Sequence, residues 1–412
     1  MPNEIYRNYR KPSRREALST MGKVIIGSIG TGIIGGIIGY YAGSVSAPPY
    51  VKTETIERTK TIRVTETIEK TIGIPPKPEK LIVRAWGGGW QYALDEAVSK
   101  TFTKKTGIRV EYDNTEDSEL QAKLVEIIPA GKTPPVDVNW TISTNAYLES
   151  SWGLASDILP EEIPNIEDML PEAKPPLIPG YKGYPFVNVY SYTYVLGYLT
   201  KYFPEPPESW WVLWEPEYKK SLAMYDDGIG FHAVLAKLAG LKIPEELAPE
   251  KMEPAWELLR KLLPNIGGLG EDPDLSMWLI REEMKLEVTI ITNILEAVRH
   301  GAKAAWTVPK EGVEMHTDAM YVPRNLPPER EYWAKQYINT ALDPEVQGKW
   351  SELLGCPPLH PKASIPEYME GDPAFPVKPE YIKKMIIIPL DILVKYQKEW
   401  FAKFEEITGG IA

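Results

Sequence analysis

Cysteine, histidine and the common catalytic motifs are scarce in this sequence of 412 residues. The single cysteine, Cys356, cannot form a disulfide within the chain, so stability must come from packing and prolines. We expect a buried, inert thiol, with a bond between two chains as the alternative. The four histidines stand at no metal-binding spacing, and neither HExxH, nor GxSxG, nor a phosphate-binding loop with lysine occurs. We therefore expect neither an enzyme nor a bound cofactor or metal.

Positive charge is also in the minority, with 46 Lys and Arg against 57 Asp and Glu and a net charge of −11. Binding to nucleic acid needs clustered Lys and Arg, so we expect no nucleic-acid partner. This balance suits a cationic or neutral ligand. The 13 tryptophans and 23 tyrosines supply both core and surfaces on which a ligand can stack.

Charge is missing altogether from residues 24–43, and none follows until Lys52. A helix of about 20 apolar residues crosses a bilayer core. Six basic residues precede the stretch, which predicts that this flank stays in the cytoplasm. We predict a cytoplasmic tail at 1–23, a single-pass signal-anchor at 24–43, and the remaining chain outside the cell membrane. A cleaved signal peptide and a buried glycine-rich helix are the alternatives.

Within the tail, the segment Ser13-Arg14-Arg15-Glu16-Ala17-Leu18-Ser19 resembles a twin-arginine export signal. It departs from that pattern at its fifth position, where an aromatic residue is usual, and at its last, where lysine is common. The resemblance implies that Arg14 and Arg15 direct the export of an already folded protein. The ordinary secretory route is the alternative.

Residues 44–79 are rich in Thr, Glu, Lys and Pro. Thr-Glu-Thr-Ile-Glu occurs at 53–57 and again at 65–69, and threonine at alternate positions favours an extended chain. Too few large apolar residues are present to build a core. We predict a stalk that ends in the stiff proline-rich piece at 75–78, with a short coiled coil or an added strand as the alternative.

From residue 80 onward, strands and helices alternate. The first pattern is a strand at 81–86, a helix from Trp90 closed by Gly107, a strand at 108–112, a helix at 120–128 and a strand at 136–140. Such alternation predicts an α/β fold with a mainly parallel sheet and helices on both faces. Further strands are predicted at 186–202, 222–225 and 303–308, and helices at 232–241, 254–263, 274–285, 293–300, 329–340, 344–354 and 378–407, the last with a break at Pro389. In such sheets, ligands bind beyond the carboxyl ends of the strands.

Four pieces, in their order and spacing, carry a family resemblance. They are Trp86-Gly87-Gly88 with Thr106-Gly107-Ile108-Arg109-Val110; 197–201 with 206–210 and 213–219; 308–312 with Asp318 and Val322-Pro323; and 334–342 with 343–347, Gly355, Pro358 and Ala363. From about residue 80 to its end, the chain resembles the type II solute-binding proteins of ABC importers, in particular the polyamine branch.

This resemblance implies a two-lobed type II periplasmic-binding-protein fold with a hinge, preceded by the transmembrane helix and stalk. Lobe 1 would hold about 80–187 and 311–375, lobe 2 about 188–305, and the C-terminal helices 376–412. Two strand crossovers would form the hinge. The expected partners are a small-molecule solute, which closes the cleft, and an ABC permease with its ATPase subunit. We expect a monomer.

The candidate ligand-binding residues are aromatic, acidic or amide side chains near predicted strand ends. They are Trp86, Trp90, Trp140, Tyr190, Tyr192, Asp226, Asp227, Asn293, Trp306 and Glu311. Tryptophan faces attract cations or stack on sugars, and core packing is the alternative for each aromatic residue. The two aspartates would neutralise a ligand amine or cap the next helix. Glu311 would bind ligand or brace the hinge.

Acidic candidates among aromatics favour a polyamine-like cation. Sugars, other small organic solutes and metal chelates stay open, because Thr-Ile-Ile-Thr-Asn at 289–293 replaces the aromatic residues that the family usually carries there. Two other function classes remain: an extracellular two-carboxylate glycosidase and a stalked surface adhesion protein. Asn139-Trp140-Thr141 is also a glycosylation acceptor pattern.

Overall fold

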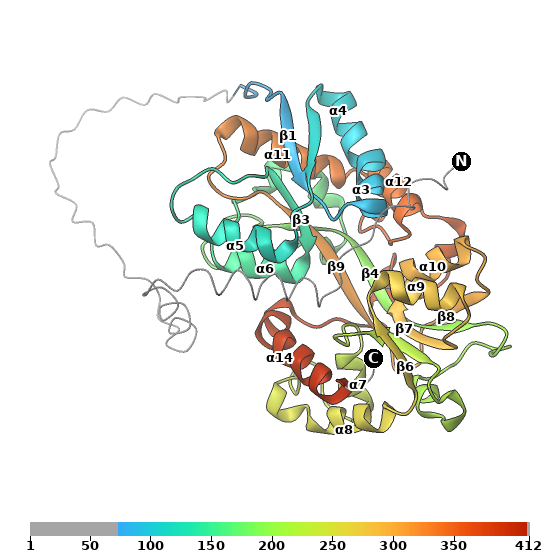
Figure 1. Cartoon of the computed structure of the whole chain (residues 1–412). Helices are drawn as coiled ribbons and strands as arrows, with labels where there is room; N and C mark the ends of the chain where they lie inside the picture. Colours follow the sequence, from blue (N-terminus) through green and yellow to red (C-terminus); the bar gives the residue numbers. More distant parts are fainter. Residues whose placement is uncertain (1–72, 410–412) are drawn as a thin grey trace, which may run out of the picture. The chain divides into compact units, whose positions relative to one another are not determined.

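The computed structural model describes residues 73–409 (Figure 1). The predicted tail with Arg14 and Arg15, the predicted signal-anchor at 24–43 and the stalk up to residue 72 lie outside the described residues. Among the helices of 73–409, none is both long and apolar enough to cross a membrane.

One mixed sheet runs through the described chain (Figure 1). Its strand order is β2-β1-β3-β9-β4-β7-β5-β6, with β10 beside β9 and β8 beside β4. The strands are β1 Lys80–Arg84, β2 Arg109–Asp113, β3 Val138–Ile142, β4 Val187–Leu199, β5 Leu222–Tyr225, β6 Ile266–Gly270, β7 Leu286–Ile290, β8 Ala304–Thr307, β9 Val313–Tyr321 and β10 Met385–Ile386.

The two long strands β4 and β9 connect the halves of this sheet. In the first half β1 pairs in parallel with β2 and β3, and in the second β5 pairs in parallel with β6 and β7. Between them, β9 is antiparallel to β3 and to β4, and β4 is antiparallel to β7. The predicted mainly parallel sheet is therefore wrong at its centre, because the two connecting strands β4 and β9 run in opposite directions.

Helices cover both faces of each half. They are α3 Gly88–Leu94, α4 Lys100–Thr106, α5 Asp117–Ile127, α6 Ser143–Ser151, α7 His232–Leu238, α8 Glu253–Leu262, α9 Asp272–Ile280, α10 Ile291–Arg299, α11 Pro328–Ala341, α12 Pro344–Leu354, α13 Pro379–Ile382 and α14 Leu390–Thr408. In the first half, α3, α4, α11 and α12 bury one core and α5 and α6 another. In the second half, α7, α8 and α14 share one core, and α9 and α10 the other. Each half thus has its own hydrophobic interior.

The burial of the first helical segment confirms the prediction from its sequence. Leu94, Val98 and Phe102 are all fully buried, as their spacing predicts. A π-helical stretch, Asp95–Ser99, joins α3 to α4 without a break. Gly107 ends α4 in the left-handed conformation at φ 80°, and its N–H donates to the Thr103 carbonyl at 2.7 Å.

Several elements depart from the sequence pattern. The strands β6, β7 and β9 and the helix α6 were not predicted. The strand β6 reads Ile-Gly-Gly-Leu-Gly, and β9 carries Glu, His and Asp at alternate positions, so neither shows an ordinary apolar pattern. The predicted C-terminal helix is divided into α13, the short strand β10 and α14, and Pro389 stands immediately before α14.

Candidate functional site

The two connecting strands present six side chains on one face. In their antiparallel register Tyr190 lies opposite Asp318, Tyr192 opposite His316, and Tyr194 opposite Glu314. Opposed residues of an antiparallel pair share a face, and so do alternate residues along a strand. We call these six residues the connecting surface. Tyr192 and His316 are partly exposed, whereas the other four are buried.

Hydrogen bonds tie this surface together. The Tyr190 hydroxyl donates to Asp318 Oδ2 at 2.5 Å, and His316 Nε2 lies 3.2 Å from Glu314 Oε2. Burial raises the pKa of Asp318 to about 7, and the nearby charge of Asp117 adds to this, while the tyrosine hydrogen bonds and Arg84 oppose it. At neutral pH the Asp318 carboxyl is therefore partly protonated, and a cation beside it would favour the ionised form.

Acidic groups gather around Tyr194. Burial raises the pKa of its hydroxyl well above the ordinary value, and four carboxylates raise it further: Asp272, Asp227, Glu314 and Asp318. These groups come from the connecting strands and from the second half of the sheet. The centre of the connecting surface thus lies in a negative electrostatic environment.

A tryptophan cluster borders the connecting surface in the first half. Its members are Trp86, Trp90, Trp140, Tyr190 and Trp350. The Trp86 and Trp140 ring centroids are 4.6 Å apart, and Trp90 stacks on Tyr190 at 6.4 Å with 24° between the planes. Trp140 is fully buried within β3 rather than beyond its end, and Tyr190 is 3% exposed. Only Trp86 and Trp90 of this cluster are partly exposed, so they are its available ring faces.

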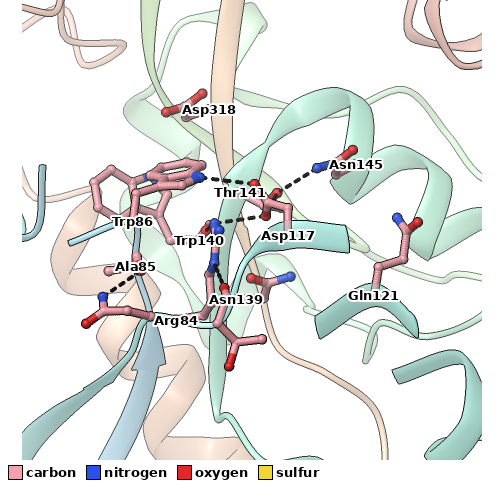
Figure 2. Close-up of polar contacts among 12 residues, drawn as sticks. Arg84, Ala85, Trp86, Asp117, Gln121, Asn139, Trp140, Thr141, Asn145 and Asp318 are labelled. Carbon is pink, nitrogen blue, oxygen red and sulfur yellow. Dashed lines mark hydrogen bonds and ion pairs between the residues drawn. The ribbon is translucent and has the colours of Figure 1, made fainter. Parts of the chain in front are cut away.

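Asp117 lies beside the cluster at the start of α5 (Figure 2). Its Oδ1 forms an ion pair with Arg84 Nη1 and accepts a hydrogen bond from Thr141 Oγ1, each at 2.8 Å. Its Oδ2 accepts from Trp86 Nε1 at 3.0 Å. Arg84 is 1% exposed and lies 4.8 Å from the centroid of the Trp86 ring. The arginine charge is thus paired inside the protein, as a buried cation requires.

A second buried network lies behind Arg84. Asn139 Nδ2 donates to the Tyr321 hydroxyl at 3.1 Å and to Glu149 Oε2 at 3.3 Å, and Tyr321 donates to the same carboxylate oxygen at 2.6 Å. Burial raises the pKa of Glu149 to about 7. Asn139 is 2% exposed, so in the folded protein its amide is not available as a glycosylation acceptor.

The second half contributes a polar cluster at the carboxyl ends of β5, β6 and β7. Asn293 Nδ2 donates to Asp272 Oδ1 at 2.9 Å, to the Tyr225 hydroxyl at 3.0 Å and to Thr289 Oγ1 at 3.0 Å. Tyr225 donates to Asp272 Oδ1 at 2.5 Å, and its ring packs edge-on against Tyr194 at 5.7 Å. Rings and carboxylates therefore continue from the tryptophan cluster, across the connecting surface, to Asp272.

The predicted pair Asp226 and Asp227 lies in the turn after β5. The Asp226 N–H donates to the Gly270 carbonyl at 3.2 Å, and Asp227 Oδ1 accepts from the Ile229 N–H at 2.9 Å. Asp227 also contributes to the electrostatics of Tyr194. The structure thus gives Asp227 a turn-forming contact and places it near the connecting surface.

Two predicted residues lie away from this group. Trp306 on β8 is opposite Gly197 of β4, which places it on the face of β4 that Tyr190, Tyr192 and Tyr194 do not share. Its Nε1 donates to Asp372 Oδ2 at 2.8 Å. Glu311 accepts from Ser209 Oγ at 2.5 Å and from the Trp210 N–H at 3.2 Å, which fits the bracing role rather than ligand contact.

Sequence reasoning did not propose several residues of this arrangement as ligand candidates. They are Arg84, Asp117, Tyr225, Asp272, Glu314, His316 and Asp318. The alternation of Glu314, His316 and Asp318 was a readable signal of a strand with one polar face. Within residues 73–409, no three His, Cys, Asp or Glu side chains are grouped so as to hold a metal ion.

Comparison with known proteins identifies the family. Residues 97–377 match the family described as bacterial extracellular solute-binding protein. The spermidine/putrescine-binding periplasmic protein of Salmonella typhimurium is 26% identical over 278 residues, which cover 65% of this chain and 75% of that protein.

Two solved structures illustrate the shared fold. The spermidine/putrescine ABC transporter substrate-binding protein PotD from Streptococcus pneumoniae aligns with a TM-score of 0.65 and 21% identity, over 80% of this chain and all (100%) of that one. MotA from A. tumefaciens B6, in complex with glucopine, aligns with a TM-score of 0.63 and 18% identity, over 80% of this chain and 99% of that one. The two halves of the sheet are therefore the two lobes of a solute-binding protein fold.

These relatives are transporter components and not enzymes, so the glycosidase hypothesis is set aside. The chain belongs to the bacterial extracellular solute-binding proteins, which deliver small solutes to the permease and ATPase of an ABC importer.

Proposed function

We propose that this protein captures a polyamine-like cation at the connecting surface and delivers it to its importer. The observation that carries this proposal is the set of four carboxylates around Tyr194, drawn from the connecting strands and the second lobe. An ammonium group among them gains charge-assisted hydrogen bonds, and it relieves the repulsion among the carboxylates. The faces of Trp86 and Trp90 add cation–π attraction for the rest of a flexible cation.

Asp318 is the first charge partner we assign to the ligand. It is buried between the lobes and bonded to Tyr190, and its partly protonated state leaves it ready to ionise beside a cation. Asp272 is the second, because the Tyr225 hydroxyl and the Asn293 amide both donate to its Oδ1 and hold the carboxylate in place. The names of the sequence relatives, which bind spermidine and putrescine, support the same class of solute.

A neutral solute with hydroxyl groups is the second candidate. The observation that favours it is the cluster of Asn293, Thr289 and Tyr225, which offers amide and hydroxyl groups. Thr289 and Asn293 belong to the stretch in which the family usually carries aromatic residues. Such groups recognise hydroxyls by hydrogen bonds rather than by charge.

The location of the protein is part of the proposal. The uncharged stretch at 24–43 and the basic residues before it support a single-pass anchor with the binding domain outside the cell membrane. On this view Arg14 and Arg15 direct export, 44–79 is the stalk, and one monomer serves the importer. The proposed lobe limits are 80–187 with 311–375 for lobe 1 and 188–305 for lobe 2, followed by the C-terminal helices from 376.

A thermal-shift screen of residues 73–412 tests the function. The screen covers putrescine, spermidine, sugars, amino acids, thiamine and ferric iron. A solute that binds only the native protein stabilises it by about 2.7 kcal/mol at a hundredfold excess over Kd. We expect a shift with polyamines that Asp318→Asn reduces and that the surface variant Asp168→Asn leaves intact. A shift with sugars alone would replace the cation with the hydroxylated solute, and no shift with any compound would contradict both candidates.

A further inference from the structure

Asp117 is an acidic side chain of the site, and groups of the protein already occupy both of its carboxylate oxygens. Its Oδ1 is paired with the charge of Arg84 Nη1 and accepts a hydrogen bond from Thr141 Oγ1, and its Oδ2 accepts one from the indole N–H of Trp86 (Figure 2). Its side chain is 26% exposed, so proximity alone would make it a candidate partner for a cationic solute. A ligand amine would, however, have to compete with donors that are already in place.

We infer that Asp117 is a positioning residue, which fixes the indole of Trp86 and does not itself neutralise the ligand. This inference rests on the proposed function for its consequence at the ligand. On this inference Asp318 supplies negative charge to the ligand, whereas Asp117 holds the indole ring of Trp86 in its orientation.

Trp86 is held from several directions before any ligand arrives. Asp117 accepts its N–H, the Arg84 guanidinium lies 4.8 Å from its centroid, and Trp140 packs edge-on against it at 4.6 Å. A ring fixed in this way loses little rotational freedom when a solute stacks on it, which improves affinity without any new contact.

Arg84 explains why a carboxylate stands at this position. The guanidinium is buried and also donates to the carbonyls of Thr115 at 3.1 Å and Trp140 at 2.9 Å. Two carbonyls do not neutralise its charge, so a carboxylate must be close by. Asp117 meets this need with one oxygen, and its other oxygen is left to hold Trp86.

A double-mutant cycle in the full-length protein tests the inference, with spermidine as the probe. The variants are Asp117→Asn, Trp86→Phe and their combination, and the readout is Kd by calorimetry. We expect each single change to weaken binding by about threefold to thirtyfold, and the combination to be no weaker than Trp86→Phe alone. If the losses multiply instead, Asp117 contacts the ligand directly and the inference is overturned.

Two further variants keep the result interpretable. Thr141→Val removes one donor to Asp117 without changing charge, so it should weaken binding less than Asp117→Asn and should have no effect beside Trp86→Phe. It also replaces Asp117→Asn in the cycle if that variant does not fold. Glu119→Gln, on the exposed side of the same helix and paired with Lys123, removes the same charge and should leave Kd unchanged.

A measurement on the free protein separates this inference from the proposed function. The indole N–H of Trp86, observed by NMR, should exchange with solvent faster in Asp117→Asn and in Thr141→Val than in the wild type or Glu119→Gln. Equal exchange rates in all four proteins would show that Asp117 does not hold the Trp86 ring and would overturn the inference. If spermidine does not bind at all while exchange still accelerates, the proposed cation fails and the positioning contact stands.

Discussion

At the scale of single residues, Asp318 is the group on which the proposed chemistry depends most. It is 3% exposed, and its Oδ2 accepts a hydrogen bond from the hydroxyl of another buried residue, Tyr190. Burial without a cationic partner in direct contact explains why its pKa rises to about 7. Ionising this buried carboxyl group costs free energy in the free protein, and a bound cation would offset that cost.

Cation affinity should therefore depend on pH near neutrality. A raised pKa means that the free protein holds a proton on Asp318 below about pH 7, and a cation binds the ionised form. Below that pH, binding must expel the proton, so affinity for putrescine should fall by up to about tenfold per pH unit. Calorimetry at pH 6, 7 and 8 in two buffers of different ionisation enthalpy would measure both Kd and proton release.

The control for that experiment is Asp318→Asn. This variant should bind putrescine more weakly at pH 8 and should lose the pH dependence between 6 and 8. A wild-type affinity that stays flat across this range would contradict the role of Asp318. The pKa of Glu149, in the network with Asn139 and Tyr321, also rises to about 7. A pH dependence of affinity that persists in Asp318→Asn would therefore indicate Glu149.

At the scale of elements, β4 connects the lobes and needs close packing on both sides. The ring of Tyr194 lies directly against the backbone at Gly230, which has φ 80°. A Cβ at Gly230 would lie 2.0 Å from Tyr194 Cγ, far inside van der Waals contact. The loop before α7 can therefore approach the connecting surface only with glycine at this position.

Gly230→Ala should lower the free energy of unfolding by about 2–4 kcal/mol, from backbone strain together with overpacking. Gly240→Ala is the matched control, because Gly240 has φ 83° and open space around its Cβ position, so it should cost only about 1 kcal/mol. Chemical denaturation measures both. Equal decreases in the free energy of unfolding would show that the clash with Tyr194 adds nothing to the cost of the backbone strain.

The segment 73–79, just before β1, is another element with defined contacts. Trp333 Nε1 on α11 lies 3.3 Å from the Pro75 carbonyl and 3.1 Å from that of Pro76. Lys77 donates to the Thr106 carbonyl at 2.7 Å and lies 5.7 Å from the centroid of the Trp333 ring. The end of the proposed stalk is thus fastened to the first lobe.

A protein that starts at residue 80 should consequently unfold more easily than one that starts at residue 73. We expect a loss of about 1–3 kcal/mol, because Trp333 loses its hydrogen bonds and part of its cover. Trp333→Phe in the longer protein should lose about 1 kcal/mol, since it removes the hydrogen bonds but keeps most of the packing. Identical denaturation midpoints for the two starts would contradict this fastening.

At the scale of the whole molecule, one sheet passes through both lobes, and the long strands β4 and β9 join its two halves. Cys356 lies in the core of the first lobe at 2% exposure, close to Tyr190 of the connecting surface. Burial raises the pKa of its thiol well above the ordinary value. The thiol is therefore protonated and shielded while the lobe is folded.

Cys356 can serve as a reporter of opening of the fold. We expect a thiol reagent such as DTNB to label the native protein at least about a thousandfold more slowly than the denatured chain. A bound solute should slow labelling further, in proportion to the stability it adds. Rapid labelling of the native protein would contradict the burial of this residue.

Part of this architecture could be predicted because its signals are local. The burial of Leu94, Val98 and Phe102 follows from helical spacing, and the shared face of Tyr190, Tyr192 and Tyr194 follows from strand alternation. Trp140 shows the limit of such reasoning. Its position was predicted to be a strand end, but β3 continues to Ile142 and its ring is buried beneath Trp86.

The sequence by itself determined most of the helices, some of the strands, and the acidic and aromatic character of the chain, because periodicity and composition are local properties. Its motifs, in their order and spacing, determined the family resemblance. Only the tertiary structure decided which groups meet. Tyr190 and Asp318 are 128 positions apart, and their contact depends on the register of β4 against β9. A slip of one residue would turn either strand's side chains to the other face, and no local pattern sets that register. The same holds for Asp117, whose two oxygens are occupied because two separate segments, at 84–86 and at Thr141, converge on them.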